Sequence, residues 1–502
     1  MTGTSSLPSV KVGNQTAAIV SICLCSFMNA YLMVSVFPYA GFLCIRMIPS
    51  ANEENAGSYA GLLESSFMVG RTLTSYEWGR LSDRYGRVFV LISSLLLSSL
   101  FSVLFGFSKS FIYAVFWRFC LGMSNGMLGC TKTVATEIAN GEEMLEQRAM
   151  ALVIGMRAWG YLFGPAIGGL LAEPLQQYPN FWRGDEWQVQ LLTKYPFILP
   201  NFLGSICCII AVVTVCLFLP ETLELSKRTS PWRIPADLIN TLISSSRQVI
   251  SRTGSLFSSD DQLSPADVKA ILPLNKNDET KGRQKSIWSR LDTRALLISH
   301  WIYSFISMAA DVAFPLFCMS HRGGLGLNGA SIGKILSGAG VLFACAQYAV
   351  FKTVVHHFGV HSALVIGSMI GIQPCTLIPS SLVLQDQLGQ VTWVIFSLLA
   401  LLMGIVKTCS CLFFTSLALA LNKTVPSEQR GRMNGICNTG GSIARAIAPT
   451  MIGLLVSFSF SDNIFSAQYG SLVIYGVLSL LGAVTFLHVK MVVVRIGDGQ
   501  IK

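Results

Sequence analysis

Between two apolar stretches the chain reads Gly79-Arg80-Leu81-Ser82-Asp83-Arg84-Tyr85-Gly86-Arg87, with three arginines and one aspartate in nine residues. The flanking segments, 59–78 and 88–107, are largely apolar. A stretch this charged cannot lie in hydrocarbon, so it is predicted to be a short connection at a membrane surface between two antiparallel helices. It has two possible roles: a basic loop that only fixes topology, or a loop that also latches two halves of a transporter.

The composition is that of an integral membrane protein. Of 502 residues, 52% are hydrophobic and only 12% are charged, whereas soluble domains carry about a quarter charged residues. The net charge of +10 is unevenly distributed, because most of the 36 Lys and Arg residues fall in segments assigned to one side of the membrane. By the positive-inside rule this side is cytosolic. The charge therefore indicates topology, and no nucleic-acid partner is expected.

Apolar runs of about 20 residues predict membrane-spanning helices, and the chain has twelve of them. They begin near Ala17, Tyr59, Val88, Phe111, Ala149, Pro196, Arg294, Ser331, Ser362, Val391, Asn434 and Gln468. An interruption divides them six and six, and the even number places both termini in the cytosol. The predicted divisions are a cytosolic tail (1–16), a first helical half (17–220), a cytosolic linker (221–293) with a membrane-surface helix near 231–250, a second helical half (294–489) and a cytosolic tail (490–502).

The two groups of six helices echo each other in their loops, which indicates an internal duplication. The loop 352–359 follows the eighth predicted helix, and its Gly359 aligns with Gly86 of the opening stretch. The loops after helices four and ten read Glu146-Gln147-Arg148 and Glu428-Gln429-Arg430. These correspondences fall where a duplication would place them.

The predicted fifth helix contains Gly160-Tyr161-Leu162-Phe163-Gly164-Pro165-Ala166-Ile167-Gly168-Gly169. Glycines four residues apart form a flat face that lets another helix approach closely. Pro165 removes a backbone donor and bends the helix. Ordinary tight packing explains a single glycine pair, but the full pattern is much rarer.

Residues 79–87 resemble the signature loop of the major facilitator superfamily. Gly160, Gly164, Pro165, Gly168 and Gly169 resemble the antiporter motif of its drug:proton antiporter branch. The stretches 65–87, 118–138, 219–222 and 428–449 are most similar to the zinc-induced-facilitator-like family. The resemblance covers nearly all of the membrane-embedded chain. It implies an all-α fold of two pseudo-symmetric six-helix bundles with alternating access to a central cavity, and export of organic ions, or of metal chelators and their complexes, in exchange for protons.

The resemblance also implies a gate at the opening stretch. Its members are Gly79, Asp83, Arg84, Gly86, Arg87 and Glu137. In this arrangement Arg87 pairs with Glu137. Asp83 is expected to engage the start of the eleventh helix, because the dipole at a helix N-terminus favours an anion.

Polar and ionisable residues inside the spans are candidates for the cavity, because charges are costly in lipid unless they face water or a partner. The candidates are Glu64, Arg71, Arg118, Asn125, Lys132, Asp311, Lys407 and Arg445. Arg118, Asn125 and Lys132 are seven residues apart and are expected to share one helix face, as are Glu64 and Arg71. Ion pairing that only fixes helix register is an alternative for any single residue, but the set as a whole favours a polar cavity.

Two roles within this set are more specific. The resemblance assigns Arg118 to proton coupling, while Glu64 and Arg157 stand where family members are expected to have uncharged residues. Glu64 and Asp311 are the candidate proton carriers, because a carboxylate in dry surroundings binds a proton more readily.

No catalytic residue, metal site or cofactor is expected. His356, His357 and His361 lie in a predicted loop with no nearby carboxylate or cysteine, which favours a solvated loop over a metal site. The phosphate-binding pattern GxxxxGK[ST] is absent, so an ATP-driven pump is not expected.

The predicted function is secondary active transport rather than enzymatic activity. The expected protein is a monomer, and its partners are the lipid bilayer, a small-molecule substrate and protons as the coupling ion. Symport or facilitated diffusion on the same fold is one alternative, and a non-transporting receptor or scaffold is another. The loop and helix-five motifs favour transport, since a scaffold has little need for either.

Overall fold

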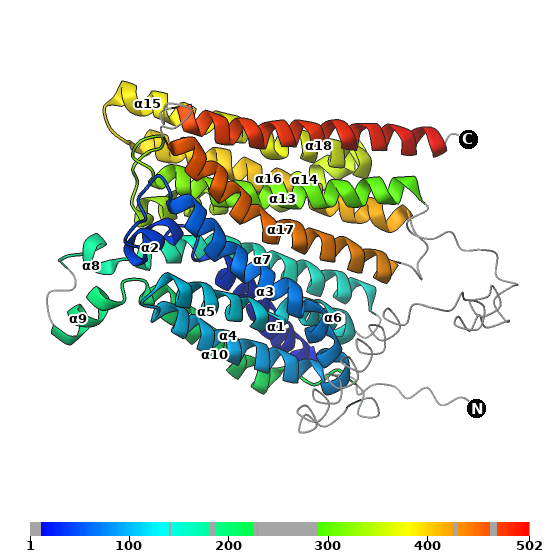
Figure 1. Ribbon diagram of the computed structural model, residues 1–502. Helices are drawn as coiled ribbons and strands as arrows, with labels where there is room; N and C mark the ends of the chain where they lie inside the picture. The colour runs from blue at the N-terminus through cyan, green and yellow to red at the C-terminus, as the bar shows by residue number, and fades with distance from the viewer. Residues whose placement is uncertain are drawn as a thin grey trace, which may run out of the picture.

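The chain folds into long helices that lie side by side (Figure 1). The computed structural model describes residues 12–139, 142–180, 186–223, 228, 290–424, 430–461 and 469–500, and these contain no strand. The first half comprises α1 (Val12–Val34), α2 (Ala40–Met47), α3 (Ala56–Tyr85), α4 (Arg87–Gly106), α5 (Phe111–Ser124), α6 (Met127–Ile138), α7 (Glu143–Leu171), α8 (Pro174–Gln177), α9 (Glu186–Lys194) and α10 (Ile198–Phe218). The second half comprises α13 (Leu291–Met319), α14 (Gly329–Ile372), η5 (Gln373–Leu377), α15 (Ser380–Leu388), α16 (Trp393–Thr424), α17 (Arg430–Phe460) and α18 (Gly470–Gln500).

Ten segments of the described chain are long and apolar enough to cross a membrane. They coincide with ten of the predicted spans, namely the first, the third and the fifth to twelfth. The second, α3, is more polar along its length, and the fourth is divided between α5 and α6. An all-helical, multi-pass membrane fold is confirmed, while the count of twelve spans stays a prediction. The helix predicted near 231–250 lies outside the described residues.

The fourth predicted span is broken at Asn125, whose φ and ψ are −82° and 64°. This corrects the expectation of one continuous helix. The hydroxyl of Ser94 on α4 donates to the carbonyl oxygen of Ser124 at 2.6 Å and accepts from the backbone N–H of Gly126 at 3.1 Å. Non-helical backbone persists at membrane depth only where protein groups satisfy it. The serine of α4 therefore makes the break tolerable.

Two turns depend on a glycine with positive φ. Gly86 has φ 110° between α3 and α4, and Gly359 has φ 76° inside α14, where it separates the eighth and ninth predicted spans. Side chains disfavour this region, and glycine does not. These are the two glycines that the sequence repeat aligns, so the echo between the loops extends to their backbone conformation.

The two halves meet along two helix pairs, α3 with α17 and α7 with α14. We call the end of the bundle that carries α2 and α8 (left in Figure 1) the far end, and the end that carries the α3–α4 turn the basic end. Towards the far end, a Cβ on Gly61 would overlap the carbonyl oxygen of Pro449, and one on Gly169 would overlap the backbone of α14. Small residues thus bring the backbones of the two halves into direct contact, as in other membrane helix pairs.

The face of α3 that packs on α17 towards the far end is exposed towards the basic end. Gly57, Gly61 and Ser65 contact α17, and the same face continues at helical spacing to Tyr76 and Gly79. Tyr76 is 74% exposed, and no described residue outside this stretch of α3 comes within 4 Å of a Cβ built on Gly79. The halves therefore touch towards the far end and separate towards the basic end.

Candidate functional site

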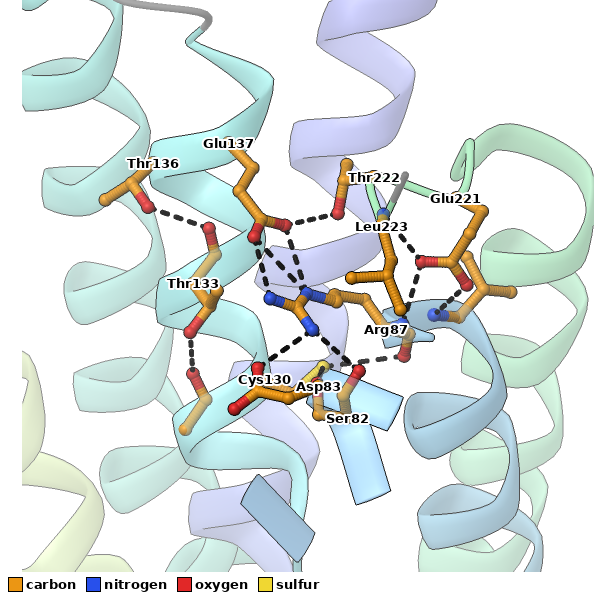
Figure 2. Close-up of polar contacts among 12 residues, drawn as sticks. Ser82, Asp83, Arg87, Cys130, Thr133, Thr136, Glu137, Glu221, Thr222 and Leu223 are labelled. Atoms are coloured by element: carbon orange, nitrogen blue, oxygen red, sulfur yellow. Dashed lines mark hydrogen bonds and ion pairs between the residues drawn. The ribbon is translucent and has the colours of Figure 1, made fainter. Parts of the chain in front are cut away.

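Arg87 is the centre of a buried polar network at the basic end (Figure 2). Its guanidinium donates to both carboxylate oxygens of Glu137 at 2.9–3.3 Å and to the carbonyl oxygen of Ser82 at 2.6 Å. Thr222 also donates to Glu137. The pair implied by the family resemblance is present. Because the Arg87 side chain is only 8% exposed, these charge-assisted bonds are weakly screened, and they tie α3, α4 and α6 together.

Glu221 holds the start of α4, a role that the sequence analysis missed. Its carboxylate accepts from the backbone N–H groups of Arg87 at 2.8 Å and Val88 at 3.2 Å, where a helix has unpaired donors and the positive end of its dipole. A side chain on Gly86 would overlap this carboxylate. An acidic residue directly after the Leu219-Pro220 end of a span is the sequence signal that identifies it.

Asp83 pairs with Arg87 at 3.0 Å, and its side chain is 77% exposed. The segment directly before the eleventh helix, 425–429, lies outside the described residues, so the expected contact of Asp83 with the start of that helix stays a prediction. Gly79 and Arg84 are exposed on the same turn. The echo at 428–430 falls partly outside the described residues.

The glycine pattern of α7 packs this helix against two neighbours. Gly160, Gly164 and Gly168 face α1, and a Cβ on Gly168 would overlap the carbonyl oxygen of Ser35. Gly169 faces α14 in the other half. Pro165 lies inside α7, as predicted. The close approach expected from the pattern is present, and its main partner is α1.

Arg118 is fully buried and binds the end of α1. Its guanidinium donates to the carbonyl oxygens of Leu32 at 2.7 Å and Met33 at 2.5 Å, which belong to the last turn of α1 and have no partner within that helix. It also lies over the ring of Phe67, 4.7 Å from the centroid. A cation at a helix C-terminus is favoured by the dipole, so Arg118 fixes the position of α1 relative to α5.

The two candidate proton carriers lie on α3 and α13, one in each half. Glu64 on α3 is 3% exposed, its Oε2 atom has no hydrogen-bond partner, and it interacts electrostatically with Arg118 and Asp311. Asp311 on α13 forms an ion pair with Lys407 on α16, and their side chains are 13% and 28% exposed. The structure thus brings one acidic group of each half towards the other, each beside a cation.

The remaining candidates form a different group. Arg71, Lys132 and Arg445 interact electrostatically with one another and with Arg157 on α7. Arg157 is a residue that the sequence analysis noted but did not place among the cavity candidates. The sequence of α7 alone does not predict this grouping, because Arg157 interacts with residues of other helices.

The expected shared face of Arg118, Asn125 and Lys132 is not present. Asn125 lies at the break between α5 and α6, where its side chain is hydrogen-bonded to that of Asn29 on α1. The break separates Arg118, which binds α1, from Lys132, which faces the arginine group. Glu64 and Arg71 lie seven residues apart on the unbroken α3 and so share one face, but their electrostatic partners differ.

The histidines near the α14 turn form no metal centre with other described residues, among which no group of three or more His, Cys, Asp or Glu side chains is suitably placed. His356 and His357 are exposed, and their rings lie 5.0 Å apart.

Comparison with known proteins agrees with this architecture. The family model of the Major Facilitator Superfamily matches residues 19–409. A probable peptide/nitrate transporter of Arabidopsis thaliana is 30% identical over 87% of this chain and 83% of its own length. The protein ZINC INDUCED FACILITATOR-LIKE 1 of the same plant is 29% identical over the same shares. Among solved structures, a D-xylose-proton symporter superposes with a TM-score of 0.65 at 14% identity, covering 94% of this chain and 97% of that one.

The match to the family spans most of the chain, and the helices within it carry the signature loop and the glycine pattern of α7. The chain therefore belongs to the major facilitator superfamily of membrane transporters and is similar to its zinc-induced-facilitator-like members.

Proposed function

We propose that this transporter is a proton-coupled antiporter that exports a small organic ion, or a metal chelator, by alternating access. The observation that carries the proposal is Glu64, a buried carboxylate that interacts with Arg118 in its own half and with Asp311 in the other. Its Oε2 atom has no hydrogen-bond partner. Burying a carboxylate oxygen without a partner is costly, and a proton on that oxygen removes most of the cost.

Protonation of Glu64 acts on the contact between the halves. A charged Glu64 attracts Arg118 and repels Asp311 across the interface. A neutral Glu64 removes that repulsion and leaves Asp311 with its partner Lys407. The two protonation states therefore favour different separations of the halves, which is the differential interaction that a coupling ion needs.

The basic end faces the cytosol in this proposal, as the excess of Lys and Arg on that side supports. With the far end closed, the conformation is then open to the cytosol, where an exporter takes up its cargo. The gate residues Asp83 and Arg87 are released from the second half in this state, and Asp83 reaches the start of α17 when the basic end closes. The proposed working unit is the monomer.

Flux from proteoliposomes tests the function. Vesicles containing the purified chain are loaded with a cytosolic metabolite extract, and efflux is followed by mass spectrometry with the exterior either acidic or at the luminal pH. Antiport predicts that a subset of metabolites leaves faster with the acidic exterior, and that Glu64→Gln abolishes this acceleration while the exposed-surface control Asp386→Asn retains it.

Each alternative gives its own result. Efflux that ignores the gradient indicates facilitated diffusion, and efflux slowed by the acidic exterior indicates symport. A chain that moves no metabolite behaves as a receptor or scaffold, and the proposal then fails.

A further inference from the structure

Four basic side chains from both halves act on one another inside the protein. Arg71 on α3, Lys132 on α6 and Arg157 on α7 belong to the first half, and Arg445 on α17 belongs to the second. Arg71 and Arg157 converge on two neighbouring groups, because Arg71 contacts Met33 Sδ, to which Tyr161 also donates (3.9 Å), and Arg157 donates to Tyr161. Lys132 and Arg445 lie within electrostatic range of both. All four are partly buried. We call them the cation cluster.

The cation cluster has only neutral partners among the described residues. Its hydrogen bonds run from Arg71 Nη1 to Met33 Sδ (3.6 Å), from Arg157 Nη2 to Tyr161 Oη (3.2 Å) and from Arg445 Nη2 to Ser304 Oγ (3.4 Å). The candidate proton carriers have other partners, Glu64 lying beside Arg118 and Asp311 pairing with Lys407. None of the four cations forms an ion pair with a described carboxylate.

Helix packing alone does not explain such an arrangement. Ion pairs that fix helix register need both signs of charge, whereas like charges gathered in a partly buried site repel one another. The Nε–H of Arg157 is moreover buried without an acceptor, and an unsatisfied charged donor is among the most unfavourable buried groups. What the cluster lacks is negative charge with several acceptor oxygens.

We propose that the cation cluster binds a small organic anion carrying at least two negative charges, as carboxylates or phosphates, and that this anion is the cargo. The inference rests on the proposed transport function and narrows its substrate class. Guanidinium groups bind the two oxygens of a carboxylate or phosphate in a bidentate manner. The anion touches both halves, because Arg445 approaches it from the second half and the other three cations from the first.

The position of the cluster also makes closure of the basic end depend on whether the anion is bound. The halves separate towards the basic end, and closing that end brings Arg445 nearer to the cations of the first half. Without an anion this movement increases repulsion, and with one it increases attraction. The loaded carrier therefore closes more readily than the empty one.

Binding is tested first, independently of transport. The full-length protein in detergent is heated in increasing citrate, glucose 6-phosphate or tetraethylammonium chloride, with sodium chloride keeping the ionic strength equal. We expect citrate, glucose 6-phosphate or both to raise the melting temperature at concentrations where tetraethylammonium does not. The two anions separate a carboxylate site from a phosphate site. Stabilisation by tetraethylammonium alone, or by none of the three, overturns the inference.

Variants assign the effect to the cluster. Arg157→Gln and Arg445→Gln are each expected to raise the anion concentration for half-maximal stabilisation about tenfold, the size of one lost charge-assisted hydrogen bond. Arg157→Lys keeps the charge and recovers most of the affinity, which guards against a folding defect. Lys109→Gln removes a charge from the exposed surface and serves as the matched control. Equal stabilisation of the wild type and both Gln variants overturns the inference.

Flux separates this inference from the proposed function. Proteoliposomes are loaded with the anion that stabilises the protein, and counterflow is measured with the same anion outside. Stabilisation without any flux leaves the binding site in place and defeats the transport proposal. Flux of tetraethylammonium in preference to the anions supports transport and defeats the anion site.

Discussion

The backbone of Gly61 on α3 lies directly against the carbonyl oxygen of Pro449 on α17, with no space for a side chain between them. This contact joins the two halves. It lies among the small residues that close the far end, where Ser58 and Ser457 also share a hydrogen bond of 2.8 Å. Towards the basic end the same two helices carry no such contact at Gly79. The α3–α17 pair is therefore in close contact towards the far end and apart at Gly79.

A bulky residue at Gly61 is expected to open the far end. In Gly61→Leu the side chain meets the backbone of α17, so the far-end-closed state loses stability and the opposite state gains population. The measurement is labelling of a cysteine introduced at Ser65 by a membrane-impermeant reagent added from the far side, which should increase several-fold. Gly476→Leu is the matched control, since a Cβ there meets nothing within 4 Å. Unchanged labelling would show that this contact does not close the far end.

Asp83→Asn is expected to slow exchange more than it weakens substrate binding. In the state described here Asp83 is 77% exposed and pairs with Arg87 of its own half, so its charge is expected to matter chiefly when the basic end closes. The maximal flux should fall about tenfold, as for loss of a hydrogen bond to a charged group, while the half-saturating concentration stays within about twofold. Glu77→Gln, on the exposed face of the same helix, is the control. Wild-type flux in Asp83→Asn would remove Asp83 from the gate.

Replacing Glu221 by Gln is expected to weaken the start of α4. The amide retains the shape of the carboxylate but loses its charge next to two backbone N–H groups, and helix caps of this kind contribute about 1 kcal/mol. Thermal unfolding in detergent should show a loss of this size. Asp386→Asn, exposed and distant from the network, should show none. An unchanged melting temperature would mean that Glu221 does not stabilise the α4 terminus.

The Asp311–Lys407 pair is expected to show strong coupling in a double-mutant cycle. Lys407→Met leaves Asp311 partly buried without its partner and should destabilise the protein by about 1–3 kcal/mol. Adding Asp311→Leu should recover most of this loss, because the uncompensated charge is then gone. Additive losses in the double variant would show that the two side chains do not stabilise each other.

The sequence predicted the helices of this fold and part of its polar network. Long apolar runs bounded by charge located the spans, and the pairing of Arg87 with Glu137 followed from a motif whose two members are each recognisable in the chain. Gly86 and Gly359 were aligned by the repeat, and their shared positive φ agrees with it.

Other features were beyond sequence reasoning for identifiable physical reasons. The break at Asn125 depends on Ser94, which is distant in sequence and resembles any other small residue of a membrane helix. The grouping of Arg157 with Arg445 joins helices of different halves, so helical periodicity does not reveal it.

The break between α5 and α6 divides the fourth span into two segments that bind different partners. The segment before the break, α5, is fixed to α1, because Arg118 donates hydrogen bonds to the carbonyl oxygens at the end of α1. The segment after the break, α6, carries Lys132 of the cation cluster and Glu137 of the Arg87 network. Asn125 at the break is itself hydrogen-bonded to Asn29 of α1. One span therefore has two sets of partners: α5 and the break bind α1, whereas α6 binds the polar network of the α3–α4 turn.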